Sequence, residues 1–324
     1  MTESSARPHP AARRLLPACA AAALLVPQVS SGAALLGGAA LALTLGNPWP
    51  ASTRRAVKRL LPLAVVGLGG GMDLRAVLAT GARGFGYTLV SIAACLAVGR
   101  LLARALRVEN NTGLLITVGT AICGGSAIAA AAPVVRAEEH ETSVALATVF
   151  VLNGLALLIF PAIGHRAGLE QGQFGVWAAL AIHDTSSVVG ASLQYGQRAL
   201  QVATSIKLAR ALWIVPVTLA LGVAVGRRRQ DGAAAAPGAR PWFILGFVVL
   251  AALVTFAPAL RPAGHLASEA AKRVMVLVLF LIGAGLSRDA LRALGLRPVA
   301  HGVLLWVAVG VASLGAIQAG LLSP

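Results

Sequence analysis

The sequence predicts an all-α integral membrane protein, and two observations lead to that class. Of its 324 residues, 57% are hydrophobic and only 12% are charged, whereas about a quarter of the residues in a typical soluble domain are charged. The apolar residues also gather in long blocks that carry almost no charge. Such blocks suit helices that cross the roughly 30 Å hydrocarbon layer of a bilayer, so we expect a polytopic protein with the lipid bilayer as its surroundings.

Nine apolar runs are long enough to be candidate spans, and two further segments, 111–136 and 173–195, are apolar but interrupted by glycine and polar residues. If both interrupted segments cross the membrane, the chain has eleven crossings; if both fold back, it has nine. The nine runs are 15–28, 30–46, 60–73, 85–104, 141–164, 200–226, 242–260, 272–288 and 299–322.

The connections between these runs are short, so residues 1–324 are expected to form one integral membrane domain. Residues 1–14 read as a cytoplasmic tail before a first span rather than as part of a cleaved signal. The Ala/Gly/Pro-rich stretch 227–241 reads as a cytoplasmic loop. The three cysteines all lie in apolar blocks, so no disulfide framework or zinc pattern is expected.

The net charge of +16, from 27 Lys and Arg against 11 Asp and Glu, would suggest nucleic-acid binding in a soluble protein. In a membrane protein it instead reports orientation, because cytoplasmic loops are enriched in Lys and Arg. With the N-terminus in the cytoplasm, most of the basic residues fall at cytoplasmic ends. We therefore expect a multi-pass membrane protein with a cytoplasmic N-terminus and no nucleic-acid partner.

Two internal similarities predict an inverted repeat. Residues 69–81 align without a gap with residues 283–295, five small residues coincide, and the two copies would run in opposite directions. A weaker pairing joins 111–136 and its following span to 173–195 and its following span. If that pair is also inverted, the interrupted segments must enter from opposite faces, which favours re-entrant elements.

The first segment with candidate chemistry is centred on Gly124 and Gly125, with Thr120, Cys123 and Ser126 around them. Adjacent glycines weaken a helix and free backbone N–H and C=O groups, which membranes tolerate only where they are buried in protein or line a cavity. A helix restarting at Ser126 would direct its N-terminal dipole toward an anion. The alternative is close helix packing through small residues.

The second segment carries five consecutive polar residues in apolar surroundings. Such a group is expensive in lipid, so it should face a cavity or partner charges. The His-Asp pair could also carry protons. The alternative is an extramembrane loop that holds these side chains in water. The residues are His183, Asp184, Thr185, Ser186 and Ser187.

The third segment contains Lys207 and Arg210, which are three residues apart and share one face of a predicted span. Beside Asp184 they could form an anion site or an internal salt bridge, although Lys207 could instead snorkel to the nearer surface. Asn153, in the middle of the preceding long span, could add a polar ligand or serve as a helix-to-helix contact.

Other patterns fail on context. The glycines near Gly69 lack the strand-turn-helix unit of a dinucleotide site, and Ser126 lacks the flanks of a nucleophile elbow. The acidic patch around His140 is interpreted as a solvated connection. No cofactor or metal site is expected, and an intramembrane enzyme or a receptor is a less favoured reading.

At these motifs the sequence resembles the YeiH family of bacterial inner-membrane proteins, which are named as sulfate exporters. The resemblance covers about Leu15 to Leu322 and rests on GTAICGGSA at 119–127, HDTSSVVGA at 183–191 and KLAR at 207–210. Many relatives carry His-Glu followed by Val-Ala-Gln-Val-Val at the second motif, so this chain looks like a subgroup variant, which bears on substrate identity more than on fold.

The resemblance extends to the bile-acid/sodium symporters and cation/proton antiporters, and it implies an inverted-repeat transporter with a core, a panel and unwound helices at the substrate site. The expected function is secondary transport of a small anion, sulfate or an organic or sulfonated acid, by an elevator-type mechanism coupled to protons or sodium. A homodimer is the oligomer considered. Gly124 to Ser126 and Thr185 to Ser187 would bind the anion, Lys207 and Arg210 would add positive charge, and His183, Asp184 and Asn153 would couple the ion. The alternative is cation/proton antiport through Asp184.

Overall fold

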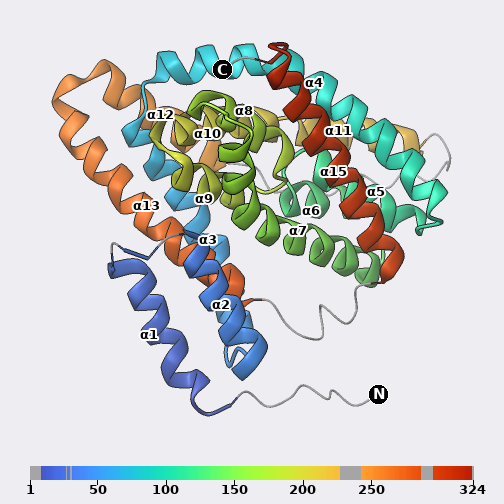
Figure 1. Ribbon diagram of the computed structural model, residues 1–324, viewed down its shortest axis with the longest axis horizontal. Coiled ribbons are helices and arrows are strands. Elements are labelled where there is room, and N and C mark those ends of the chain that lie inside the picture. The colour runs from blue at the N-terminus through green and yellow to red at the C-terminus, as the bar shows by residue number, and fades with distance from the viewer. Residues whose placement is uncertain (1–8, 27, 30, 227–241, 286–294, 323–324) are drawn as a thin grey trace. The chain divides into compact units, whose positions relative to one another are not determined.

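A computed structural model describes residues 9–322 apart from 27, 30, 227–241 and 286–294. Every regular element within these ranges is a helix (Figure 1), which confirms the all-α prediction. The predicted cytoplasmic loop 227–241 and most of residues 283–295, the second copy of the first internal repeat, lie outside the described residues. The chain divides into two compact units, Met1–Arg75 with Trp242–Arg292 and Ala76–Pro241 with Ala293–Pro324.

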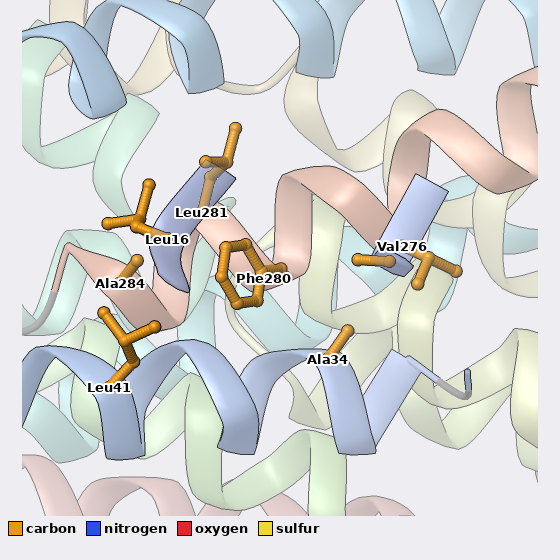
Figure 2. Close-up of a cluster of buried hydrophobic side chains, with 8 residues drawn as sticks. Leu16, Ala34, Leu41, Val276, Phe280, Leu281 and Ala284 are labelled. Carbon is orange, nitrogen blue, oxygen red and sulfur yellow. The ribbon is translucent and has the colours of Figure 1, made fainter. Parts of the chain in front are cut away.

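The first unit is built around α13, which packs against the four other α-helices of the unit. Figure 2 shows the apolar cluster between them, in which Val276, Phe280 and Leu281 of α13 lie among Leu16 of α1 and Leu41 of α2. The elements of this unit are α1 (Ala12–Leu25), α2 (Ser31–Leu45), α3 (Pro50–Leu68), η1 (Gly69–Gly71), α12 (Trp242–Phe256), η2 (Pro258–Leu260) and α13 (Arg261–Ala284).

Glycines allow these helices to approach at backbone distance. A β-carbon on Gly38 of α2 would overlap the carbonyl oxygen of Phe280 in α13, and one on Gly70 would lie 2.5 Å from the carbonyl oxygen of Gly264. Gly70 belongs to η1, the 3-10 turn formed by the glycines of the first repeat copy. Small residues at such crossings permit the close van der Waals packing that stabilises helix pairs in lipid.

The second unit contains the longest helices and both interrupted segments. Segment 111–136 forms two short helices, α5 and α6, and segment 173–195 falls within α8 and α9. The elements are α4 (Leu74–Ala105), whose first residues belong to the other unit, α5 (Asn110–Ala121), α6 (Gly125–Val134), α7 (Glu139–Arg166), α8 (Gln171–Ala181), α9 (Thr185–Tyr195), α10 (Gln197–Ala211), α11 (Ile214–Gly226) and α15 (Leu296–Gln318).

Within the described residues, four helices are long and apolar enough to cross a membrane: Phe85–Ala105, His140–Arg166, Gln197–Ala224 and Leu296–Gln318. Helices α12 and α13, bent by 114° at their junction, make a fifth if the pair counts as one span. Several runs expected to span form shorter helices, such as α1 with 14 residues and α2 with 15, whereas a full crossing takes about 20. A multi-pass membrane protein follows from these helices.

Both interrupted segments fold back as helical hairpins. In the first hairpin, α5–α6, a β-carbon on Gly119 would lie 2.9 Å from Ile128, so the two arms run side by side. The ring of His140, in the first turn of α7, lies 3.4 Å from the carboxylate of Glu109, the residue that precedes α5. The hairpin therefore begins and ends in the same place.

The second hairpin, α8–α9, is closed by aromatic contacts. The rings of Phe174 and Tyr195 stack at 3.7 Å between centroids, and the Tyr195 hydroxyl donates a hydrogen bond of 2.6 Å to the Leu169 carbonyl. The backbone N–H of Arg198 donates to the side chain of Gln171 at 3.0 Å. The start of α8 and the end of α9 therefore lie together.

The two hairpins point toward each other from opposite ends of α7. The base of the first lies at the start of α7, where Asn111 donates to Glu141 at 3.0 Å, and the base of the second follows its end at Arg166. Helix α7 has 28 residues, or about 42 Å at 1.5 Å per residue. Each hairpin is then followed by a long span, α7 or α10–α11, as the weaker internal pairing predicted.

Candidate functional site

The tips of the two hairpins meet at Gly124 and Asp184. Gly124 has φ of +65°, a conformation that L side chains rarely adopt, and it is the N-cap of α6. A β-carbon placed on it would lie 3.3 Å from the β-carbon of Asp184. Glycine is needed here both for the backbone turn and for the contact between the two tips. The helix break predicted at the paired glycines is therefore confirmed.

Asn153 links this junction to the middle of α7. Its side-chain oxygen accepts a 3.2 Å hydrogen bond from the backbone N–H of Asp184, and the side chain is 3% exposed. A helix-to-helix contact is thus the role that the geometry shows for the oxygen. The amide nitrogen Nδ2 is buried and has no hydrogen-bond partner among the described residues.

Lys207 and Arg210 lie on α10, are fully buried, and face the ends of the first arms of both hairpins. Lys207 Nζ donates to the carbonyls of Ile182 at 2.7 Å and Ala179 at 3.3 Å. The snorkelling alternative for Lys207 is therefore wrong, because its ammonium group is 0% exposed. Helix C-termini leave carbonyls unpaired and carry the negative end of the dipole, which the ammonium group balances.

Arg210 joins the two hairpins. Its Nε donates to the carbonyl of Ala121 at the end of α5 at 2.8 Å, and its Nη1 donates to the carbonyls of Leu180 at 2.8 Å and Ala179 at 3.3 Å at the end of α8. The remaining guanidinium nitrogen, Nη2, is buried and has no partner in the described part of the chain. Arg210 therefore donates hydrogen bonds to the C-terminal ends of α5 and α8, and its Nη2 group stays available for a ligand.

The two helix N-termini at the junction differ in charge. At α9 the carboxylate of Asp184 is the N-cap and accepts from the backbone N–H of Ser186 at 3.2 Å and from the Ser186 hydroxyl. At α6 the N-cap is Gly124, which makes no side-chain capping bond. The positive end of α9 thus already has an anionic group, whereas α6 does not.

Several buried polar atoms around the junction have no hydrogen-bond partner among the described residues. Buried polar groups are nearly always paired, so a group of orphans marks a place that a water or a ligand completes. They belong to residues at the hairpin tips or on the helices that contact them: Thr120 Oγ1, Asn153 Nδ2, both ring nitrogens of His183, and Arg210 Nη2.

The other predicted site residues lie at the tips with different surroundings. Cys123, Thr185, Ser186 and Ser187 are buried, and the extramembrane-loop alternative for the second segment does not fit that burial. Ser126 is exposed, so the structure does not place its side chain with the orphaned atoms.

Sequence reasoning missed the partners of the cationic pair, which are backbone carbonyls and leave no side-chain signal. It also missed His301 on α15, which is 0% exposed and lies 3.0 Å from the Gly99 carbonyl of α4 and 3.4 Å from the Thr117 hydroxyl of α5. Its position as a polar residue inside an apolar span was the available signal.

Fold and site together define a multi-pass helical membrane protein with a buried polar site between two opposed hairpins. The family model described as conserved hypothetical protein 698 matches residues 28–302, and the chain belongs to that family, which is the YeiH family that its motifs predicted. No solved structure matches the chain.

Curated relatives cover nearly the whole chain. The UPF0324 membrane protein of Bdellovibrio bacteriovorus is 56% identical over 294 residues, 91% of this chain and 90% of the relative. That of Geobacter sulfurreducens is 47% identical over 292 residues, 90% and 92% of the two chains, and that of Photobacterium profundum is 48% identical over 294 residues, 90% and 88%. Each is named as a membrane protein.

Proposed function

We propose that the protein is a secondary transporter of a small anion, with the hairpin junction as its binding site. The observation that carries this proposal is a set of hydrogen-bond donors at the junction. Within the described part of the chain, Arg210 Nη2 and Asn153 Nδ2 are buried without partners, and the α6 N-terminus at Gly124 has no side-chain cap. N–H donors and a helix N-terminus suit an oxyanion such as sulfate or a carboxylic or sulfonic acid.

An elevator-type movement fits the division of the chain. Every candidate site residue, from Thr120 to Arg210, lies in the unit formed by Ala76–Pro241 and Ala293–Pro324. A binding site contained in one compact unit can move across the membrane with that unit while its residues keep their contacts. The chain would lie in the bacterial inner membrane with its N-terminus in the cytoplasm, following the distribution of its basic residues.

The proposal is tested by anion uptake into proteoliposomes, with sulfate, acetate and a small sulfonate as probes. Arg210→Lys keeps a positive charge but loses the forked geometry that serves two helix ends and a ligand, so we expect uptake to fall at least about tenfold. Arg198→Lys on the exposed side of the same helix is the matched control. Absence of uptake of any probe by the folded wild-type protein would contradict the proposal.

A second candidate function is cation/proton antiport. It is favoured by the hydrogen bonds of Lys207 and Arg210 to backbone carbonyls, because these side chains would then balance helix dipoles. Asp184 would exchange the ion. Asp184→Asn separates the two functions. If the variant loses proton coupling but still binds an anion, the anion transporter is supported; if anions never bind and sodium or proton exchange is abolished, the antiporter is.

A further inference from the structure

Ionisable side chains are unevenly distributed at the hairpin junction. Among the described residues, the Lys, Arg, Asp and Glu side chains that are buried are Lys207, Arg210 and Glu141. Glu141 lies at the start of α7 and is paired with Asn111 at the base of the first hairpin, 12 residues or about 18 Å along the helix from Asn153. It therefore does not balance the cationic pair.

Asp184 supplies the negative charge at the tips. Its carboxylate accepts hydrogen bonds from the backbone N–H and the hydroxyl of Ser186 at the positive end of α9, an arrangement that favours the ionised carboxylate. Both ring nitrogens of His183 are buried and have no hydrogen-bond partner among the described residues, so none of these residues offers an acceptor for a second proton on the ring. With Lys207 and Arg210 protonated and Asp184 ionised, the junction has one net positive charge.

A buried site with unbalanced charge is unfavourable in a low-dielectric interior. Building on the proposed function, we infer that the junction takes its ligand with a net charge of −1: a monovalent anion alone, or a divalent anion together with one proton or one sodium ion. Asp184 is then a fixed internal anion that sets the charge of the cargo, and Asn153, hydrogen-bonded to the Asp184 backbone, is the neutral neighbour on the facing helix.

Perchlorate and sulfate are suitable probes because both are tetrahedral oxyanions of similar size that differ by one charge. Their affinities for purified protein are measured by calorimetry at constant ionic strength, and the result is the ratio of the two. We expect wild-type protein to prefer perchlorate when sodium is absent and the pH is high, and sulfate affinity to rise when sodium or protons are added.

Two substitutions of nearly unchanged shape move the site charge in opposite directions. Asp184→Asn removes a negative charge, so the net charge of the site rises by one. The affinity ratio should shift toward sulfate by about tenfold or more, and sulfate binding should no longer depend on sodium or protons. Asn153→Asp adds a negative charge, so the net charge of the site falls by one and the ratio should shift toward perchlorate. The new carboxylate can still accept the hydrogen bond from the backbone N–H of Asp184. The double variant, with its charges exchanged, should return the ratio close to the wild-type value.

A ratio that is the same in all four proteins, or that shifts the same way in both single variants, would overturn the inference, because a purely structural role weakens both anions alike. If Asp184→Asn does not fold, as judged by size-exclusion chromatography, the opposite shift in Asn153→Asp still decides the question. If folded wild-type protein binds neither probe and transports no anion, the proposed function itself fails, which is a distinct result.

Discussion

Gly124 and Asp184 face each other across the junction of two helical hairpins, with the would-be β-carbon of the first 3.3 Å from the β-carbon of the second. The tight contact brings the uncapped N-terminus of α6 next to the carboxylate that caps α9. The close approach of the two hairpin tips thus depends on a position that has no side chain.

Gly124→Ala is expected to destabilise the protein and abolish transport. A non-glycine residue at φ +65° costs about 1–2 kcal/mol, and the added methyl group would press on Asp184. Thermal unfolding in detergent, together with proteoliposome uptake, measures both effects. Gly315→Ala in α15, where an added β-carbon meets nothing within 4 Å, should retain wild-type stability; equal losses in both variants would contradict the argument.

Lys207→Met is expected to lower the melting temperature. The substitution leaves the carbonyls of Ala179 and Ile182 without the ammonium donor, and an unsatisfied buried polar group costs about 1–3 kcal/mol. Arg198→Met on the exposed side of the same helix α10 is the control, with an expected change within about 0.5 kcal/mol. A Lys207→Met protein as stable as wild type would show that the carbonyls find other donors.

The hairpin bases are expected to be accessible from opposite sides of the membrane. With Cys19, the exposed native cysteine, replaced by Ala, single cysteines at Glu138 and Arg198 mark the first and second base. An impermeant thiol reagent should label Glu138→Cys in inside-out vesicles and Arg198→Cys in right-side-out vesicles. Labelling of both from one side would overturn the opposed arrangement.

Gly38→Ala and Gly37→Ala are adjacent substitutions with opposite expected outcomes. A β-carbon on Gly38 overlaps the Phe280 carbonyl, whereas one on Gly37 meets nothing within 4 Å. Gly38→Ala should therefore separate α2 from α13 and lower stability by about 1–3 kcal/mol, while Gly37→Ala should be neutral or slightly stabilising because alanine favours a helix. Thermal unfolding of the two proteins side by side measures the difference.

Composition and apolar blocks were enough to predict the fold class. Gly124 was predicted to break a helix because adjacent glycines weaken one, and His183 and Asp184 were singled out because ionisable groups are unfavourable in lipid. The hairpin form of both segments followed from symmetry and not from local sequence. The roles of Lys207 and Arg210 could not be predicted in detail, because their acceptors are backbone carbonyls of residues such as Ala121 and Leu180, whose identity says nothing about pairing. The number of full-length spans could not be predicted from the sequence either, because apolar runs that contain proline and glycine form helices of many lengths.

The opposed hairpins also bear on the direction of transport. The first arms of the two hairpins reach the junction from opposite ends of α7, and they are α5 with 12 residues and α8 with 11. The two hairpins are thus similar in length and opposite in orientation, although their tips differ in charge. For the proposed transporter, hairpins of this kind suit movement of the anion in either direction, and the concentration gradients across the membrane would decide between import and export.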